Sequence, residues 1–126
     1  MKKATVLIVE DDKDVAYIMT HTVNRLGFSV VGNEDTGERA IKVAEELKPD
    51  IVLMDIKLNG EMDGIETAEK LGRDYKIPVI YITAMTDDKT LERIAASAPY
   101  GFILKPFRDE ELRAVIEIAL DARASR

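Results

Sequence analysis

The chain has 126 residues, 46% of them hydrophobic and 33% charged, which is typical of a single globular domain spanning residues 1–126. Its net charge of −6 argues against direct nucleic-acid binding, because the phosphate backbone repels an acidic surface. The absence of cysteine excludes disulfides, thiolate metal sites and cysteine nucleophiles. No apolar run is long enough to span a membrane and no signal peptide is evident, so we expect a cytoplasmic protein without membrane contact.

Short apolar runs alternate along the chain with segments of helical periodicity. The runs predict strands over residues 4–9, 28–32, 51–54, 77–83 and 100–105. The periodic segments predict helices over residues 15–26, 37–47, 65–71, 88–98 and from residue 109 onward. The inward stripe of the first helix is expected to comprise Val15, Ile18, Met19, Thr22, Val23 and Leu26. The inward stripe of the second is expected to comprise Ala40, Val43, Ala44 and Leu47.

Five repeats of strand and helix predict an α/β fold, with a five-stranded parallel sheet covered by helices on both faces. The strands at 4–9 and 51–54 are the most apolar and should be central, whereas the strand with Ser29 and Gly32 should be an edge. This predicts the flavodoxin-like strand order 2-1-3-4-5, in which ligands bind at the carboxyl ends of the strands.

Polar residues lie at the carboxyl ends of four predicted strands. They are Glu10, Asp11 and Asp12 after the first, Asp55 after the third, Thr83 in the fourth and Lys105 in the fifth. In a parallel sheet these ends meet at one edge, so the side chains are expected around a single rim.

Several carboxylates on one rim need a cation, because like charges about 4 Å apart repel by about 4 kcal/mol at an effective dielectric of about 20. Oxygen donors favour Mg²⁺, which also binds phosphate, and aspartate is a known phosphoryl nucleophile. Asp55 is therefore the candidate phosphoryl acceptor. Taken singly, Asp12 is better explained as a helix cap, Thr83 as an ordinary strand residue and Lys105 as a surface lysine.

The motifs "VLIVEDD", "DIVLMDIKLN…MDG", "IPVIYITA" and "GFILKPF" resemble, in order and spacing, the receiver domain of two-component response regulators. The resemblance covers nearly the whole chain and implies that a sensor histidine kinase phosphorylates Asp55. It also implies a Mg²⁺ site made by Asp55, Asp11, Glu10 through water, and the main-chain carbonyl of Lys57.

Further roles are implied by the same resemblance. Thr83 and Lys105 would hold the phosphoryl oxygens, Ala84 would leave the phosphoryl group room, and the Lys105–Pro106 peptide bond would be cis. Phe102 occupies the position of the family's switch aromatic, which is often tyrosine. The loop "IKLNGEMDG" is two residues longer than the common form and is similar to receivers that accompany PAS-containing kinases, many of them archaeal.

Lys57 and Met85 are expected to set the lifetime of the phosphoryl group, and neither orients an attacking water, so we expect slow self-dephosphorylation. Phosphorylation is expected to change the face formed by the fourth helix, fifth strand and fifth helix. By resemblance this face binds a downstream partner or output domain, or a second copy in a phosphorylation-dependent homodimer. Individual residues there, such as Glu92, Arg93 and Arg113, are expected to be ordinary solvated side chains, as is the single histidine, His21.

Alternative functions remain open or are rejected on specific residues. A haloacid dehalogenase-type hydrolase needs an acid two residues after its nucleophile, where this chain has Lys57. No glycine-rich loop supports nucleotide binding. A receiver-shaped interaction module that is never phosphorylated stays open. The chain is expected to be either a stand-alone receiver or one segment of a longer protein.

Overall fold

The computed structural model describes residues 3–84 and 87–124. Within them, strands and helices alternate throughout. The elements are β1 (Thr5–Val9), α1 (Lys13–Arg25), β2 (Ser29–Glu34), α2 (Gly37–Leu47), β3 (Ile51–Met54), α3 (Gly64–Tyr75), β4 (Val79–Thr83), α4 (Asp88–Ala96), β5 (Gly101–Leu104) and α5 (Asp109–Ala124). No helix among these residues is both long and apolar enough to cross a bilayer.

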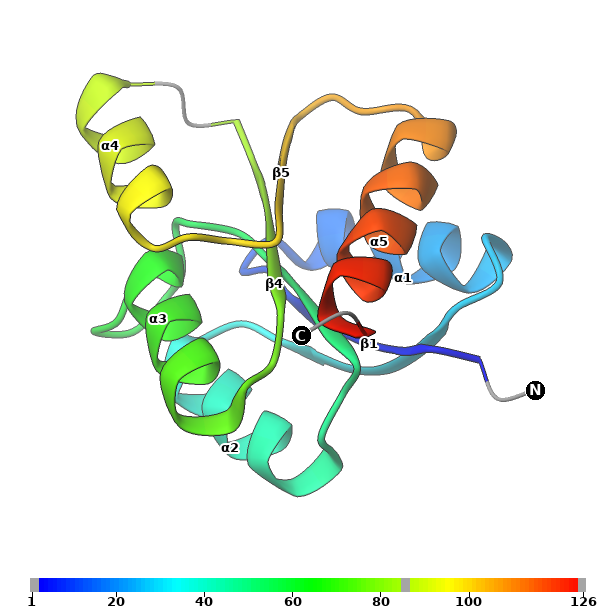
Figure 1. Ribbon diagram of the computed structural model, residues 1–126, viewed down its shortest axis with the longest axis horizontal. Helices are drawn as coiled ribbons and strands as arrows, with labels where there is room; N and C mark the ends of the chain where they lie inside the picture. The colour runs from blue at the N-terminus through cyan, green and yellow to red at the C-terminus, as the bar shows by residue number, and fades with distance from the viewer. Residues whose placement is uncertain (1–2, 85–86, 125–126) are drawn as a thin grey trace.

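The strands form one five-stranded parallel sheet in the order β2-β1-β3-β4-β5, which confirms the predicted topology. In Figure 1, α1 and α5 lie on one side of the sheet, and α2, α3 and α4 lie on the other. Helices cover both faces because successive strand residues point to opposite sides. Val6 and Ile8 belong to the apolar cluster with α1 and α5, whereas Leu7 and Val9 belong to the cluster with α2 and α3.

Side-chain caps begin the helices at the carboxyl edge of the sheet. Asp12, Thr36, Asp63 and Asp87 are the N-caps of α1, α2, α3 and α4, and each accepts hydrogen bonds from backbone N–H groups of the first turn. A Cβ on Gly37 would lie 2.1 Å from Thr67 Oγ1, so glycine allows α2 and α3 to approach closely.

A polar cluster connects elements at the opposite end of the sheet, where the strands begin. Asp50, just before β3, accepts hydrogen bonds at Oδ2 from the N–H of Thr5 at 2.8 Å and from its hydroxyl at 3.1 Å. Arg123 near the end of α5 donates to Asp50 Oδ1 at 2.9 Å. Burial opposes ionisation of Asp50, but the bonds from Thr5 and Arg123 outweigh it and lower the pKa of this carboxyl. The cluster thus ties together the starts of β1 and β3 and the end of α5.

The predicted helical stripes are too wide at two positions. Ile18 and Leu47 were expected to face inward, but they are 63% and 52% exposed. Helix α1 packs through Ala16, Met19, Thr22 and Val23, which leaves Ile18 on the outer side of the stripe. Leu47 is the last residue of α2 and its side chain is exposed at the helix end. β2 also continues two residues further than predicted, to Glu34.

Candidate functional site

The end of β1 carries the first two acids of the rim. Glu10 follows the strand directly, and its N–H donates to the carbonyl of Glu34 at 2.9 Å, so backbone pairing fixes its place. Its side chain is buried, and Oε2 accepts a hydrogen bond from the N–H of Asp12 at 3.1 Å. Asp11 is partly exposed. Asp12 lies outside this cluster because its carboxylate caps α1, as the cap explanation predicted.

Asp55 is held at the end of β3 by its own backbone. Its N–H donates to the carbonyl of Val9 at 3.0 Å, and its Oδ1 accepts from the N–H of Ile56 at 2.7 Å. Helix α3 begins against this segment, since a Cβ on Gly64 would lie 1.9 Å from the carbonyl oxygen of Asp55. Only glycine fits there, which explains the "MDG" triplet in structural terms.

Lys105 directly follows the edge strand β5, and its side chain extends to the acids at the ends of β1 and β3. Its N–H donates to the carbonyl of Thr83 at 3.0 Å, which aligns the ends of β4 and β5. Its Nζ donates to Glu10 Oε1 at 2.7 Å and lies 3.6 Å from Asp55 Oδ2. Thr83 is buried at the end of β4. The Lys105–Pro106 peptide bond is cis, as the resemblance implied.

The charges of the rim perturb one another. Burial, a hydrogen bond with Glu10 and the negative charge of Glu10 raise the pKa of Asp11, so its ionised form is disfavoured in the folded protein. Burial alone would lower the pKa of Lys105, but the hydrogen bond to Glu10 and the charge of Asp55 outweigh it and raise the pKa. With three carboxylates and one ammonium, the rim would carry a net negative charge at neutral pH and attract a cation.

Glu10, Asp11 and Asp55 form a cluster suited to a hard cation. Each offers a carboxylate oxygen, and these atoms lie within 4.8 Å of one another. Carboxylate oxygens are the donors that Mg²⁺ prefers, and this spacing is compatible with one ion held in part through water. The structure thus brings together three of the four protein groups predicted to ligate Mg²⁺. The fourth, the carbonyl of Lys57, remains a prediction.

The remaining predicted residues differ in their surroundings where the structure describes them. Phe102 in β5 is partly buried against the apolar cluster that includes Tyr81 and Ile94. Ala84 follows Thr83 and is exposed, whereas Met85 lies outside the described residues. Lys57 is exposed in the loop after β3. Its charge is one of several influences that lower the pKa of Asp87, the largest being the hydrogen bond from the N–H of Thr90.

Sequence reasoning missed one interaction beside the rim. Arg93 is exposed as expected, but its guanidinium contacts Asp63 Oδ2 at 2.8 Å and so joins α4 to the cap of α3. The sequence shows Asp63 only as part of the "MDG" motif and does not indicate this partner. His21 is exposed as expected, in edge-to-face contact with Tyr17 at a centroid distance of 4.6 Å.

Comparison with known proteins places these features in context. The family model described as "Response regulator receiver domain" matches residues 6–117. The chain is 30% identical over 115 residues to the transcriptional regulatory protein PdtaR of Mycobacterium tuberculosis H37Rv, covering 91% of this chain and 56% of that protein. It is 34% identical over 117 residues to the DNA-binding response regulator MtrA of the same strain, covering 91% and 50%.

Solved structures match the fold along its length. The signal receiver domain of a modulated diguanylate cyclase from Desulfovibrio desulfuricans G20 has a TM-score of 0.93 and 37% identity, covering 98% of both chains. The chain spans about half the length of the curated relatives it matches.

Proposed function

Because this chain belongs to the response regulator receiver domain family of two-component signalling, we propose that it is a phosphorylation-activated switch with Asp55 as its phosphoryl acceptor. The observation that carries the proposal is the convergence of Glu10, Asp11, Asp55 and Lys105 on one rim, with Glu10 and Lys105 in contact across 95 residues of sequence. A receiver domain is typically a phospho-acceptor and not an enzyme with an external substrate. For this chain we further propose slow self-dephosphorylation.

In the proposed reaction, a carboxylate oxygen of Asp55 attacks the phosphorus of a phosphohistidine on a sensor histidine kinase. A bond from oxygen to phosphorus forms, the bond from phosphorus to nitrogen breaks, and the departing imidazole keeps the electron pair and takes up a proton. Glu10 through water, Asp11, Asp55 and the carbonyl of Lys57 would hold Mg²⁺, which supplies charge neutralisation for phosphoryl transfer when bound. Lys105 would pair with a phosphoryl oxygen.

Phosphorylation would then act on β4 and β5 through Thr83 and Lys105. The modified Asp55 gains negative charge and acceptor oxygens, and each charge-assisted bond contributes about 1.5–3 kcal/mol. Shifting a two-state element from 1:99 to 99:1 takes about 5.5 kcal/mol, so two such bonds suffice only at the upper end of that range. Phe102, packed beside Tyr81 in the neighbouring strand, would be the aromatic side chain that changes position.

The output surface would be formed by α4, β5 and α5. Each of these elements exposes a large apolar side chain, namely Leu91, Leu104 and Ile118. By its likeness to the family, this surface would contact a downstream protein, an output domain or a second copy of the receiver, and these apolar side chains would be available to that contact. The relatives include proteins described as transcriptional and DNA-binding regulators. For this acidic domain we propose signalling through protein contacts rather than direct nucleic-acid binding.

The proposal is tested by incubating the protein with Mg²⁺ and a small acyl-phosphate donor and measuring intact masses. We expect one phosphoryl group on the wild-type protein and none on Asp55→Asn. Asp12→Asn is the matched control, because asparagine also caps a helix and Asp12 lies outside the rim, so it should be labelled like the wild type. Labelling of Asp55→Asn would mean that another residue is the acceptor. No labelling and no Mg²⁺ binding by the wild type would favour the unphosphorylated interaction module.

A further inference from the structure

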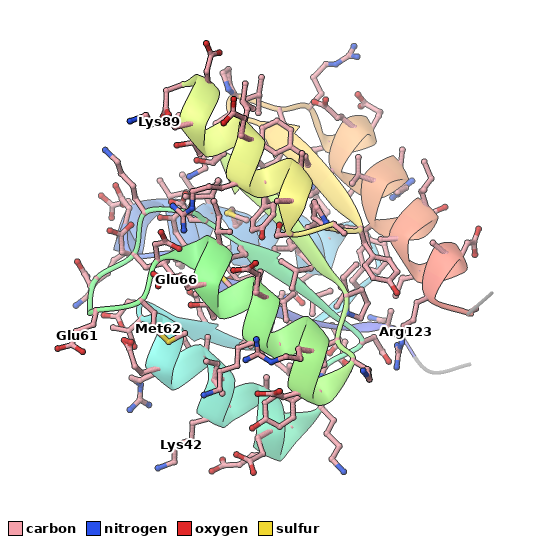
Figure 2. The ribbon with its side chains drawn as sticks, turned by 60° about the vertical axis from the view of Figure 1, so that its left-hand side comes forward. Lys42, Glu61, Met62, Glu66, Lys89 and Arg123 are labelled. Atoms are coloured by element: carbon pink, nitrogen blue, oxygen red, sulfur yellow. The ribbon has the colours of Figure 1, made fainter. Side chains whose placement is uncertain are left out.

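The loop between Asp55 and Asp63 is fixed on one side by α2. Asn59 pairs with Thr36, the N-cap of α2, in a parallel bridge. Gly60 has φ +91°, and a Cβ there would lie 2.6 Å from a carboxylate oxygen of Glu38. Figure 2 shows Met62, in the last part of the loop, beside the start of α2. This side of the loop is therefore held by backbone pairing and close packing.

The other side of the loop is held by α4. The carboxylate of Asp63 divides its two oxygens between two helices: Oδ1 accepts from the N–H of Glu66 at 2.9 Å, and Oδ2 pairs with Arg93 at 2.8 Å. The pair is partly shielded from solvent, with the Arg93 side chain 47% exposed and the Asp63 side chain 32% exposed. The hydrogen bond to Asp63 is the largest influence raising the pKa of Arg93. Arg93 is thus bound to the residue at which α3 begins.

Asp63 is in turn coupled to the rim through its neighbour. The N–H of Gly64 donates to the carbonyl of Ile56 at 2.7 Å. The absent side chain of Gly64 leaves the backbone of α3 in direct contact with the Asp55 and Ile56 peptide, where no larger residue fits. We therefore expect a displacement of Asp63 to be transmitted to the segment that carries Asp55 and Ile56.

We propose that Asp63 and Arg93 are positioning residues that couple the place of α4 to the geometry of the phosphoryl-acceptor loop. The proposal rests on the proposed function, since that loop would provide the Lys57 carbonyl for Mg²⁺. While the ion pair is formed, α4 holds the end of the loop in place. If the pair supports the loop geometry that binds Mg²⁺, linkage requires that loss of the pair weakens Mg²⁺ binding to the same extent as Mg²⁺ strengthens the pair.

The test is a Mg²⁺ titration followed by amide chemical shifts, so that Kd is measured without phosphorylation. Asp63→Asn keeps the helix cap and removes the charge, and Arg93→Gln removes the other partner. We expect each to weaken Mg²⁺ binding by about three- to tenfold, below the effect of removing a group hydrogen-bonded to a ligand. We expect the double variant to lose no more than either single one, because both remove one interaction.

Controls separate positioning from stability. Arg73→Gln removes an arginine of α3 whose ion-pair partner is the adjacent Asp74, and it should leave the Kd for Mg²⁺ unchanged. Arg93→Lys should bind Mg²⁺ more tightly than Arg93→Gln but less tightly than the wild type, because lysine keeps the positive charge and lacks the planar guanidinium. Wild-type Kd values in Asp63→Asn and Arg93→Gln, or losses that add in the double variant, would overturn the proposal. Failure of the wild type itself to bind Mg²⁺ or take up a phosphoryl group would instead overturn the proposed function.

Discussion

The ammonium of Lys105 contacts Glu10 at 2.7 Å and lies 3.6 Å from Asp55, so one cation offsets the repulsion between two carboxylates. Lys105→Met should therefore destabilise the protein in the absence of Mg²⁺. Removing one partner of a fully buried pair costs about 3–5 kcal/mol, and partial solvent screening reduces our expectation here to about 1–3 kcal/mol. Urea denaturation measures the difference. Saturating Mg²⁺ should restore part of the loss, because it supplies another cation. An unchanged free energy of unfolding would show that the contact contributes nothing.

Asp11→Asn should stabilise the protein without Mg²⁺. The raised pKa of Asp11 means that its ionised form is less favourable in the folded than in the unfolded chain, so removing the charge relieves this cost. We expect a gain of about 0.5–1 kcal/mol, the scale of partly exposed charge interactions. We also expect the variant to lose the increase in Tm that Mg²⁺ would give the wild type, because a proposed ligand is gone. Thermal melts with and without Mg²⁺ test both statements, and a variant that still responds fully to Mg²⁺ would contradict the ligand assignment.

Gly64→Ala and Gly72→Ala should have opposite effects on stability, although both glycines lie in α3. A Cβ on Gly64 would overlap backbone atoms of Asp55 and Ile56, so we expect a loss of at least about 2 kcal/mol and weaker Mg²⁺ binding. A Cβ on Gly72 meets nothing within 4 Å. Alanine there should stabilise the helix by about 0.5–1 kcal/mol. Equal effects in chemical denaturation would refute this contrast.

Asp50 should make stability depend on acidic pH. Its pKa is lowered in the folded state, so its contribution is fully present above the unfolded pKa of about 3.9 and is lost as pH falls through the folded value. Asp50→Asn should cost about 1–2 kcal/mol at neutral pH, allowing for the partial exposure of Asp50 and Arg123. The difference between variant and wild type should shrink below about pH 4. A pH-independent difference would mean that hydrogen bonding alone, and not charge, stabilises this edge.

Lys57→Asn should shorten the lifetime of the phosphoryl group. The lysine ammonium can donate a hydrogen bond to a water but cannot accept one from it, whereas an amide can do both. We expect several-fold faster loss of the phosphoryl mass after the donor is removed. Lys89→Asn, at an exposed lysine in the first turn of α4 (Figure 2), is the control and should decay like the wild type. If the wild type, Lys57→Asn and Lys89→Asn lost the phosphoryl group at the same rate, Lys57 would not control its lifetime.

The position of the rim could be predicted because it depends on topology. Once Ile51–Met54 is assigned as a central parallel strand, Asp55 must lie at the same edge as Glu10. The separation of Asp11 from Asp12 was also accessible, since an acid just before a helix is a typical cap. Both depend on local pattern and strand order, which the sequence expresses directly.

Details set by packing could not be predicted in the same way. Ile18 and Leu47 satisfy the helical period, but whether they are covered depends on where each helix meets the sheet and where it ends. The contact of Arg93 with Asp63 depends on the separation of α3 and α4, and a charged residue in a helix does not indicate its partner. Exact contacts between helices follow from three-dimensional fit, so the hydrophobic pattern does not contain them.

The edge position of β5 has a consequence for how the protein is made. β5 is the last of the described strands and pairs only with β4 among them, yet the residue after it, Lys105, completes the rim that begins at Glu10. During synthesis, the first four strands can emerge and pair before this residue leaves the ribosome. The rim is therefore complete only when nearly the whole domain has been translated and folded. A truncated or partly folded chain would carry the acceptor aspartate without the cation that belongs beside it.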